Sequence, residues 1–483
     1  MRQSLNEIKN VIDKHEYTID NIICHIMKKF NFKTICWQSG ASSIKEEGYM
    51  LSEIVTVLIM FPLMLLKTVN SFYKSQFQEI TQMQKDVIYR LKNNEKMPWR
   101  RLLYGVCKKF QQLVNPKGEI DPKSAFILDD TPDIRTGRRI ENISFVHDHV
   151  GGKGKTGSKL GFKKLILGLH DGKSFIPLDL SIHSEKKLKG KKRKEQYNKE
   201  CISNSNGDKR RKECTEQKNT NGLVMIKRAV KNGFMAKYML TDSWFNSEDF
   251  IKTIRAIKDG AIHVVCALKR DKRNYEYQGE KVNFKGLVAK LKKEKKESRY
   301  RKWNTRYFEV VVNYGEIGLV KLYISRFPYQ KEWRIFLSTD TNLNFVDMME
   351  IYSIRWSIEV FFKETKQHLG LCSCQSRDFD AQIAAVTISC ILYVFLSYYR
   401  RVNDYETLGT LFEFIKDDMC KKTVAQNMWE LFDELLTIVI KAIAESGVVD
   451  ILSFKNSPEY EYLKSIFEES FLANQIFAIS NVC

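Results

Sequence analysis

The feature that most constrains the fold is a succession of short apolar runs that begins after Pro122. These runs are rich in β-branched and aromatic residues and are separated by short polar turns, a pattern typical of strands. We expect the first strands at 126–130, 143–149, 163–170 and 175–182. A helix is expected at 223–232, a strand at 237–242, a helix ending at Gly260 and a strand at 261–268. This order of elements predicts an α/β domain with a mixed sheet flanked by helices.

The remaining chain divides by pattern into further regions. Two strands at 307–312 and 319–325 suggest a hairpin, and a strand at 333–339 resumes the style of the main domain. We therefore expect these regions: a helical N-terminal part with a DNA-binding role at 1–118, an α/β core at 119–269 and 333–400, a β-rich insertion at 270–332, and a helical C-terminal part, a candidate for dimerisation, at 401–483. The helix that ends at Gly260 has Asn246 as its expected N-cap.

The charge indicates the kind of partner. The 483 residues carry 79 Lys and Arg against 58 Asp and Glu, a formal charge of +21. A surplus of this size points to a polyanion, either nucleic acid or an anionic membrane. Thirteen basic and six acidic residues fall in 184–218, and nine basic and two acidic residues fall in 285–302. The first segment is expected to be a surface loop, which either contacts a DNA backbone or is a solvated insertion.

Two further observations limit the class of protein. The apolar segment 381–399 reaches the length of a membrane span, but its polar residues favour a buried core helix, so no membrane partner is expected. The eleven cysteines are scattered and form no CxxC pair, which favours reduced thiols over disulfides or a zinc site.

The segment YSIRWSIEVFFKETK, residues 352–366, carries the most informative pattern. On one continuous helix, a face within an arc of about 80° would carry Tyr352, Arg355, Glu359, Lys363 and Lys366. The opposite face is apolar. Taken alone, the segment also fits an amphipathic helix that is stabilised by a Glu359–Lys363 ion pair.

Two further acids suggest a chemical role for this helix. Asp130 and Asp242 each stand at the end of an expected strand. Together with Glu359 they could converge as three carboxylates, whose mutual repulsion a divalent cation relieves. Mg²⁺ prefers such oxygen ligands, and two metal ions can bracket a scissile phosphodiester. The adjacent cations would hold phosphates of the same strand.

The segment resembles the Tyr-x₂-Arg-x₃-Glu-x₆-Lys signature of DDE transposases of the insertion-sequence-four family. Tyr352, Arg355, Glu359 and Lys366 meet the signature without a gap. LDDTP is similar to the strand that carries the first acid of that family, and Asp130, immediately before Thr131, is the match in preference to Asp129. LTDSWF is similar to the strand of the second acid and gives Asp242.

The resemblance, which covers about residues 120–400, implies the fold and the reaction. It implies an RNase H-like core with a β-rich insertion, and Mg²⁺, for which Mn²⁺ substitutes, in a two-metal site held by Asp130, Asp242 and Glu359. It further implies binding of double-stranded DNA at terminal inverted repeats, nicking, strand transfer to target DNA by a cut-and-paste route, and a dimeric synaptic complex.

The same resemblance assigns DNA contacts. Tyr352, Arg355 and Lys366 would contact the DNA backbone, and Lys363 would join them. The insertion offers Trp303 and Trp333 as stacking partners for a flipped base, with simple packing inside the β-rich region as the alternative. Trp244 and Trp356 are expected to fill the core.

Two other functions remain open from the sequence. One is an inactive or domesticated DNA-binding protein derived from a transposase, and the other is an RNase H-like nuclease without strand transfer. For each of these functions we expect a location in the cytoplasm of a bacterial or archaeal cell, at the nucleoid.

Overall fold

A computed structural model describes residues 22–41, 48–75, 78, 81–148, 157–185, 196–270, 273–328, 330–403, 405, 407–421, 432–441, 455–456, 458 and 460–461. The chain forms two compact units. Unit 1 contains Met1–Phe110 and Glu364–Cys483, and unit 2 contains Gln111–Lys363. The finer region boundaries expected above stay predictions.

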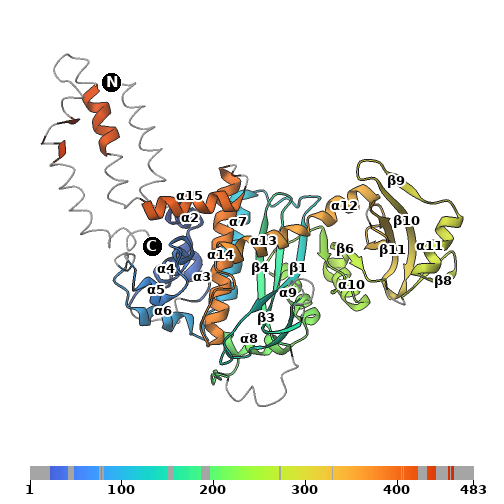
Figure 1. The fold of residues 1–483 in the computed structure, drawn as a ribbon, viewed down its shortest axis with the longest axis horizontal. Coiled ribbons are helices and arrows are strands. Elements are labelled where there is room, and N and C mark those ends of the chain that lie inside the picture. The colour runs from blue at the N-terminus through green and yellow to red at the C-terminus, as the bar shows by residue number, and fades with distance from the viewer. Residues whose placement is uncertain are drawn as a thin grey trace. The chain divides into compact units, whose positions relative to one another are not determined.

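Unit 1 is helical in its described part (Figure 1). Its helices include α2 (Ile22–Phe30), α3 (Phe32–Gln38), α4 (Leu51–Leu63), α5 (Val69–Phe72), α6 (Lys85–Lys92), α7 (Trp99–Val114), α14 (Phe379–Val402) and α15 (Leu408–Lys421). Helix α14 packs against α2, α4, α6 and α15. It is long and apolar enough to cross a membrane, but 94% of its most apolar stretch is buried, which confirms the expected core helix at 381–399.

Unit 2 contains all the described strands. They are β1 (Ala125–Ile134), β2 (Ser144–Asp148), β3 (Gly157–His170), β4 (Phe175–His183), β5 (Tyr238–Thr241), β6 (His263–Leu268), β7 (Asn274–Tyr277), β8 (Glu280–Asn283), β9 (Ser298–Tyr300), β10 (Thr305–Tyr314), β11 (Gly318–Arg326) and β12 (Arg334–Ser338). The helices are α8 (Asn206–Thr215), α9 (Lys218–Lys231), α10 (Glu248–Arg255), α11 (Phe284–Lys293), α12 (Phe345–Ser353) and α13 (Trp356–Gln367), with short 3₁₀ turns η4 (Ile257–Gly260) and η5 (Gly315–Ile317).

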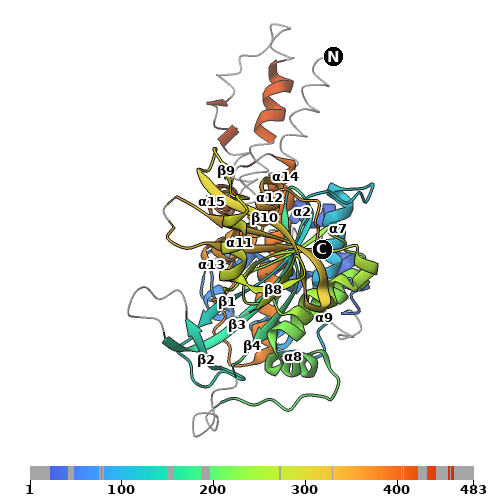
Figure 2. The same cartoon turned by 90° about the vertical axis from the view of Figure 1, so that its right-hand side faces the viewer.

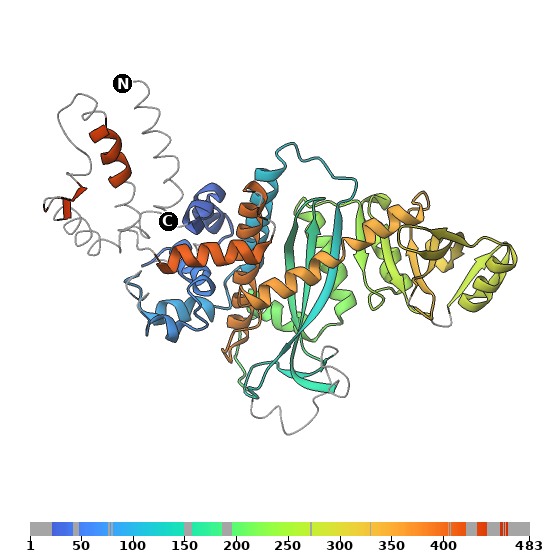
Figure 3. The same cartoon turned by 45° about the horizontal axis from the view of Figure 1, so that its top comes forward.

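The strands form one mixed sheet. Its order is β2-β3-β1-β5-β6-β12-β11-β10-β7-β8, with β4 paired to β3 and β9 paired to β10. Strand β5 runs parallel to β1 and β6, and the other pairs are antiparallel. Helices α8 and α9 pack on β4 (Figure 2), and Figure 3 shows α12 and α13 as consecutive orange helices that run along the sheet.

The structure confirms the predicted strands, whose apolar residues suit burial on both faces of the sheet. All four residues of β5 and the first four of β1 are buried. Parallel strands covered on both faces require such continuous apolar runs. The strands expected within 270–332 are also present, and β11 joins them to the main sheet through β12. Their standing as a separate insertion domain stays a prediction.

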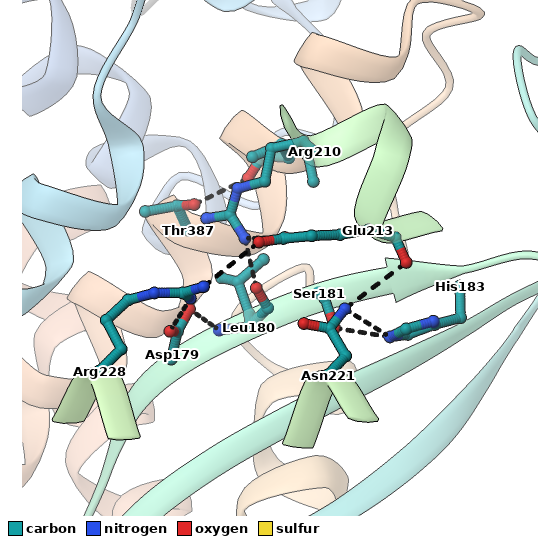
Figure 4. A network of polar contacts seen from close by, with 10 residues as sticks. Asp179, Leu180, Ser181, His183, Arg210, Glu213, Asn221, Arg228 and Thr387 are labelled. Atoms are coloured by element: carbon teal, nitrogen blue, oxygen red, sulfur yellow. Dashed lines mark hydrogen bonds and ion pairs between the residues drawn. The ribbon is translucent and has the colours of Figure 1, made fainter. Parts of the chain in front are cut away.

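The expected loop at 184–218 is wrong over its second half. Helix α8 occupies 206–215, and α9 begins at Lys218. Figure 4 shows the reason: the buried Arg210 guanidinium donates to the carbonyl of Leu180 on β4, and Arg228 of α9 pairs with Asp179 of the same strand. These polar contacts fix both helices to the sheet, and a lysine-rich composition does not reveal them.

Several basic residues in the described part of this segment pair with acids within unit 2. Arg211 forms an ion pair with Glu141 at 2.7 Å, and Lys212 pairs with Asp208 at 2.8 Å. The part of the segment at 186–195 lies outside the described residues. In contrast, the lysines and arginines of 285–302 are largely exposed on α11 and the β9–β10 hairpin.

The N-cap of α10 also differs from expectation. Ser247 is the cap, and its hydroxyl accepts a hydrogen bond from the Phe250 N–H at 3.2 Å. The side chain of Asn246 instead bonds to Thr241 and to the carbonyl of Ala267, so it connects the loop to β5 and β6.

Gly161 provides a test of the β1–β3 pairing. A Cβ at this position would lie 2.3 Å from the carbonyl oxygen of Asp133, a main-chain atom that cannot rotate away. We expect Gly161→Ala to destabilise unit 2 by about 1–3 kcal/mol, measured by chemical denaturation. Gly157→Ala is the matched control, because the same strand leaves that Cβ nothing within 4 Å. Equal stability of the two variants would contradict the pairing.

Candidate active site

Strand β1 carries two adjacent aspartates on opposite faces of the sheet. Successive strand side chains alternate between faces, so Asp129 and Asp130 point in opposite directions. Asp129 lies on the face of Arg355, whose guanidinium is 3.1 Å from its carboxylate. Asp130 lies on the face of Lys163 and Lys218.

The parallel register explains why Asp129 and Asp242 are neighbours. Ile127 pairs with Leu240 and Leu128 with Thr241. Continued by one residue, this register sets Asp129 beside Asp242, just past the last residue of β5. Paired residues share a face, so both carboxylates lie on the same side at the carboxyl end of the parallel strands. This is the end at which α/β sheets bind ligands.

The signature segment is two helices and not one. Helix α12 ends at Ser353 and α13 begins at Trp356. The N–H of Arg355 bonds to the carbonyl of Tyr352 at 3.1 Å, which makes a tight turn between them. The expectation of one continuous helix over 352–366 is therefore wrong. The guanidinium of Arg355 pairs with the carboxylates of Asp129 and Glu359, the second at the i,i+4 spacing of a helix.

The acids influence one another electrostatically. Burial, and then the negative charge of Asp242, raise the pKa of Asp129 to about 7, against the opposing effect of Arg355. Burial raises the pKa of Tyr352 to about 12, and Asp242 adds to this effect. Tyr352, Arg355, Asp129, Asp242 and Glu359 thus form one cluster.

Asp130 has a different environment. Its carboxylate pairs with Lys218 of α9 and lies 3.6 Å from the ammonium of Lys163, a residue only 4% exposed. The structure therefore does not bring Asp130 to Arg355 and Glu359. Asp129, the residue that the sequence resemblance disfavoured, occupies that place.

The lysines of the signature lie further along α13. Lys363 and Lys366 are both exposed, one and two turns beyond Glu359. The apolar side of the segment is buried as expected, through Ile351, Ile358 and Phe361. Both lysine side chains therefore lie on the solvent-exposed face of α13.

Two of the four tryptophans considered above are more exposed than expected. Trp303 packs edge-on against Tyr300 with ring centroids 4.8 Å apart, and Trp333 packs on Phe308 at 5.1 Å. Both are partly buried, which suits the packing alternative. The expected core positions of Trp244 and Trp356 are wrong, because these side chains are 46% and 62% exposed.

Residues 164–395 match the family described as the transposase DDE domain. The matched range contains Asp242 and the whole signature segment, and it begins after Asp129 and Asp130. The match supports a DDE transposase, a nuclease-like enzyme of phosphoryl transfer. No curated protein sequence matches the chain.

DDE transposases generally use divalent metal ions. The carboxylates of this site are suited in part to binding such an ion. Within the described residues no group of three or more His, Cys, Asp or Glu side chains is close enough to form a metal site. However, Asp129 and Asp242 are adjacent carboxylates, and burial disfavours the charge of Asp129. A cation bound there would remove that penalty. Arg355 bridges Asp129 and Glu359, so this bridge would have to open for both acids to bind one ion.

Sequence reasoning ranked Asp129 below Asp130, and it overlooked Lys163, Lys218 and the turn at Arg355. The signal for Asp129 is present: pairing FILD (126–129) with MLTD (239–242) by strand register sets the first aspartate, and not the second, beside Asp242. No comparable signal identifies Lys218, because its contact with Asp130 depends on the packing of α9.

The raised pKa of Asp129 predicts a pH dependence of stability. The native state holds this proton more tightly than the unfolded chain, whose pKa is near 3.8. The free energy of unfolding should therefore fall as the pH rises from about 4 to about 7, by an amount on the order of 2 kcal/mol, and level off above.

Chemical denaturation of metal-free protein between pH 5 and pH 8 measures this fall. Asp129→Asn should remove most of it, whereas the exposed control Asp259→Asn should keep the wild-type slope. An unchanged slope in Asp129→Asn would show that Asp129 is not buried beside Asp242.

Proposed function

We propose that this chain is a DDE transposase of the insertion-sequence-four type. In this proposal it binds double-stranded DNA at terminal inverted repeats, cleaves it with a divalent metal ion, and transfers the freed strand to target DNA. Mg²⁺ is the proposed cofactor, with Mn²⁺ as a substitute. The proposal includes a homodimer as the form that joins two transposon ends, in the cytoplasm at the nucleoid.

One observation carries the proposal. Three carboxylates from separate segments, Asp129, Asp242 and Glu359, lie around the guanidinium of Arg355 or beside one another at the carboxyl end of the parallel strands. A strand with a purely structural role would need no partly buried carboxylate whose charge a neighbouring carboxylate disfavours. Acids gathered in this way are suited to a cation that acts on phosphate oxygens.

The proposed roles follow from position. Asp129, Asp242 and Glu359 would hold the metal ions, which when bound activate a nucleophile and stabilise the leaving oxygen. The guanidinium of Arg355 already faces the acids and can donate two hydrogen bonds. It can therefore hold a non-bridging phosphate oxygen once its ion pairs with Asp129 and Glu359 open. Tyr352 is protonated at neutral pH, and its raised pKa moves ionisation still further away, so its hydroxyl can donate to phosphate. Lys363 and Lys366 would contact the backbone of the same strand.

The exposed basic surface supports DNA as the partner. The segment 285–302 carries nine basic residues against two acidic ones, largely in solvent. DNA binding by such a surface should weaken steeply as the salt concentration rises, because counterions are released.

Substitution of the acids tests the proposal. With DNA that flanks the coding sequence and contains the element's ends, wild-type protein should cleave when Mg²⁺ or Mn²⁺ is added. Asp242→Asn and Glu359→Gln should lower the cleavage rate by about 100-fold or more, because each removes a metal ligand. Retained cleavage in either variant would mean that the site is elsewhere.

The neighbouring aspartates give a matched pair. Asp129→Asn should reduce cleavage as strongly as Asp242→Asn does, since both carboxylates lie on the same face. Asp130→Asn should have a smaller effect, because its carboxylate pairs with lysines on the other face. The reverse order of effects would restore Asp130 as the first metal ligand.

An assay for joined products separates the transposase from its two alternatives. Cleavage followed by covalent joining of the freed end to target DNA supports a transposase. Cleavage without any joining supports a nuclease, and binding without cleavage supports an inactive DNA-binding protein.

A further inference from the structure

The guanidinium of Arg355 holds two of the three acids that the proposed metal ions require. One of its terminal nitrogens lies 3.1 Å from a carboxylate oxygen of Asp129, and the other pairs with the carboxylate of Glu359. We call these two ion pairs the Arg355 bridge. The bridge compensates both negative charges from within the chain, so a divalent cation at these acids has to compete with a cation that the protein itself supplies.

The bridge can open by movement of one side chain. Main-chain hydrogen bonds fix the backbone of Arg355, from its own N–H to the carbonyl of Tyr352 at 3.1 Å and from the N–H of Ile358 to its carbonyl at 3.2 Å. The side chain of Arg355 is 16% exposed, and those of Asp129 and Glu359 are 20% and 33% exposed. A ligand in solvent can therefore reach the guanidinium while the backbone stays in place.

A phosphate group competes with the acids for this guanidinium. Arginine binds carboxylate and phosphate through the same parallel N–H donors, and its planar fork suits both. A phosphate that takes these donors leaves Asp129 and Glu359 as uncompensated negative charges close to Asp242. Clustered carboxylates repel one another, and a divalent cation relieves that repulsion. Transfer of Arg355 from carboxylate to phosphate therefore raises the affinity of the acids for a divalent cation.

We propose that the Arg355 bridge couples metal binding to DNA binding. This inference rests on the proposed function and assigns a regulation to that site. Without DNA, Arg355 competes with the divalent cation for Asp129 and Glu359. A backbone phosphate of the bound strand takes the guanidinium, and the two carboxylates become available to the cation beside that phosphate. Coupling between two ligands is reciprocal, so the cation and the DNA raise each other's affinity by the same factor.

The affinity for Mn²⁺ with and without DNA tests this coupling. Free Mn²⁺ is measured by electron paramagnetic resonance, which reports binding and not activity. The DNA is a duplex that contains one end of the element, the spectra are recorded before cleavage is detectable, and a titration of the duplex alone is subtracted. DNA should raise the affinity of wild-type protein for Mn²⁺ by about 10-fold, and Mn²⁺ should raise the affinity for the duplex equally.

Substitution of Arg355 should remove the coupling. Arg355→Gln loses the charge but keeps a side chain that donates hydrogen bonds. Without DNA this variant should bind Mn²⁺ about 10-fold more tightly than wild-type protein, because no internal cation competes for Asp129 and Glu359. DNA should then add little to its affinity for Mn²⁺. Arg355→Lys keeps the charge with fewer donors and should give an intermediate affinity, and it serves if Arg355→Gln does not fold.

Two further variants are the controls. Lys363→Gln removes the same charge from an exposed position on α13, one turn beyond Glu359, without breaking the bridge. It should keep the wild-type affinity for Mn²⁺ in the absence of DNA. Asp242→Asn should weaken Mn²⁺ binding both with and without DNA, which assigns the measured ion to the acid cluster.

The outcomes separate this inference from the proposed function. The inference is overturned if Asp242→Asn weakens Mn²⁺ binding but DNA does not change the wild-type affinity, or if Arg355→Gln binds Mn²⁺ no more tightly than wild-type protein without DNA. Those results would leave the proposed metal site intact. Mn²⁺ binding that Asp242→Asn does not weaken would instead count against the proposed function itself.

Discussion

The arrangement of the site depends on the guanidinium of Arg355. Without it, Asp129, Asp242 and Glu359 would be three negative charges at one end of a sheet, and their repulsion would oppose folding. Arg355 lies in the tight turn between α12 and α13, and its guanidinium pairs with Asp129 and Glu359. A carboxylate cluster that is held by an internal cation in this way is preorganised for an external one.

Much of the fold was accessible from the sequence because its signals are local. The strands of the main sheet are continuous apolar runs, and β5 and the start of β1 are buried on both faces as such runs require. The apolar side of the signature segment is also buried, through Ile351, Ile358 and Phe361. These predictions depend on the burial of apolar side chains, which a single sequence records directly.

The parts that escaped prediction depend on contacts between distant segments. Helix α8 exists in a lysine-rich stretch because Arg210 reaches the carbonyl of Leu180, and Trp244 is exposed in the loop after β5, where its ring contacts Lys218 and Phe245. The choice between Asp129 and Asp130 as the first acid could be predicted only in part. Motif likeness favours Asp130, but strand register favours Asp129, and register is the physical constraint because one residue reverses the face.

The most direct test of the account is the position of a bound metal ion. Crystals of the protein soaked with Mn²⁺ would reveal the ion by its anomalous scattering. The account predicts a peak within coordination distance of Asp129 and Asp242, with Glu359 completing the site and the guanidinium of Arg355 moved away from the carboxylates. A peak at Asp130 on the opposite face, or an intact Arg355 bridge with manganese bound elsewhere, would contradict it.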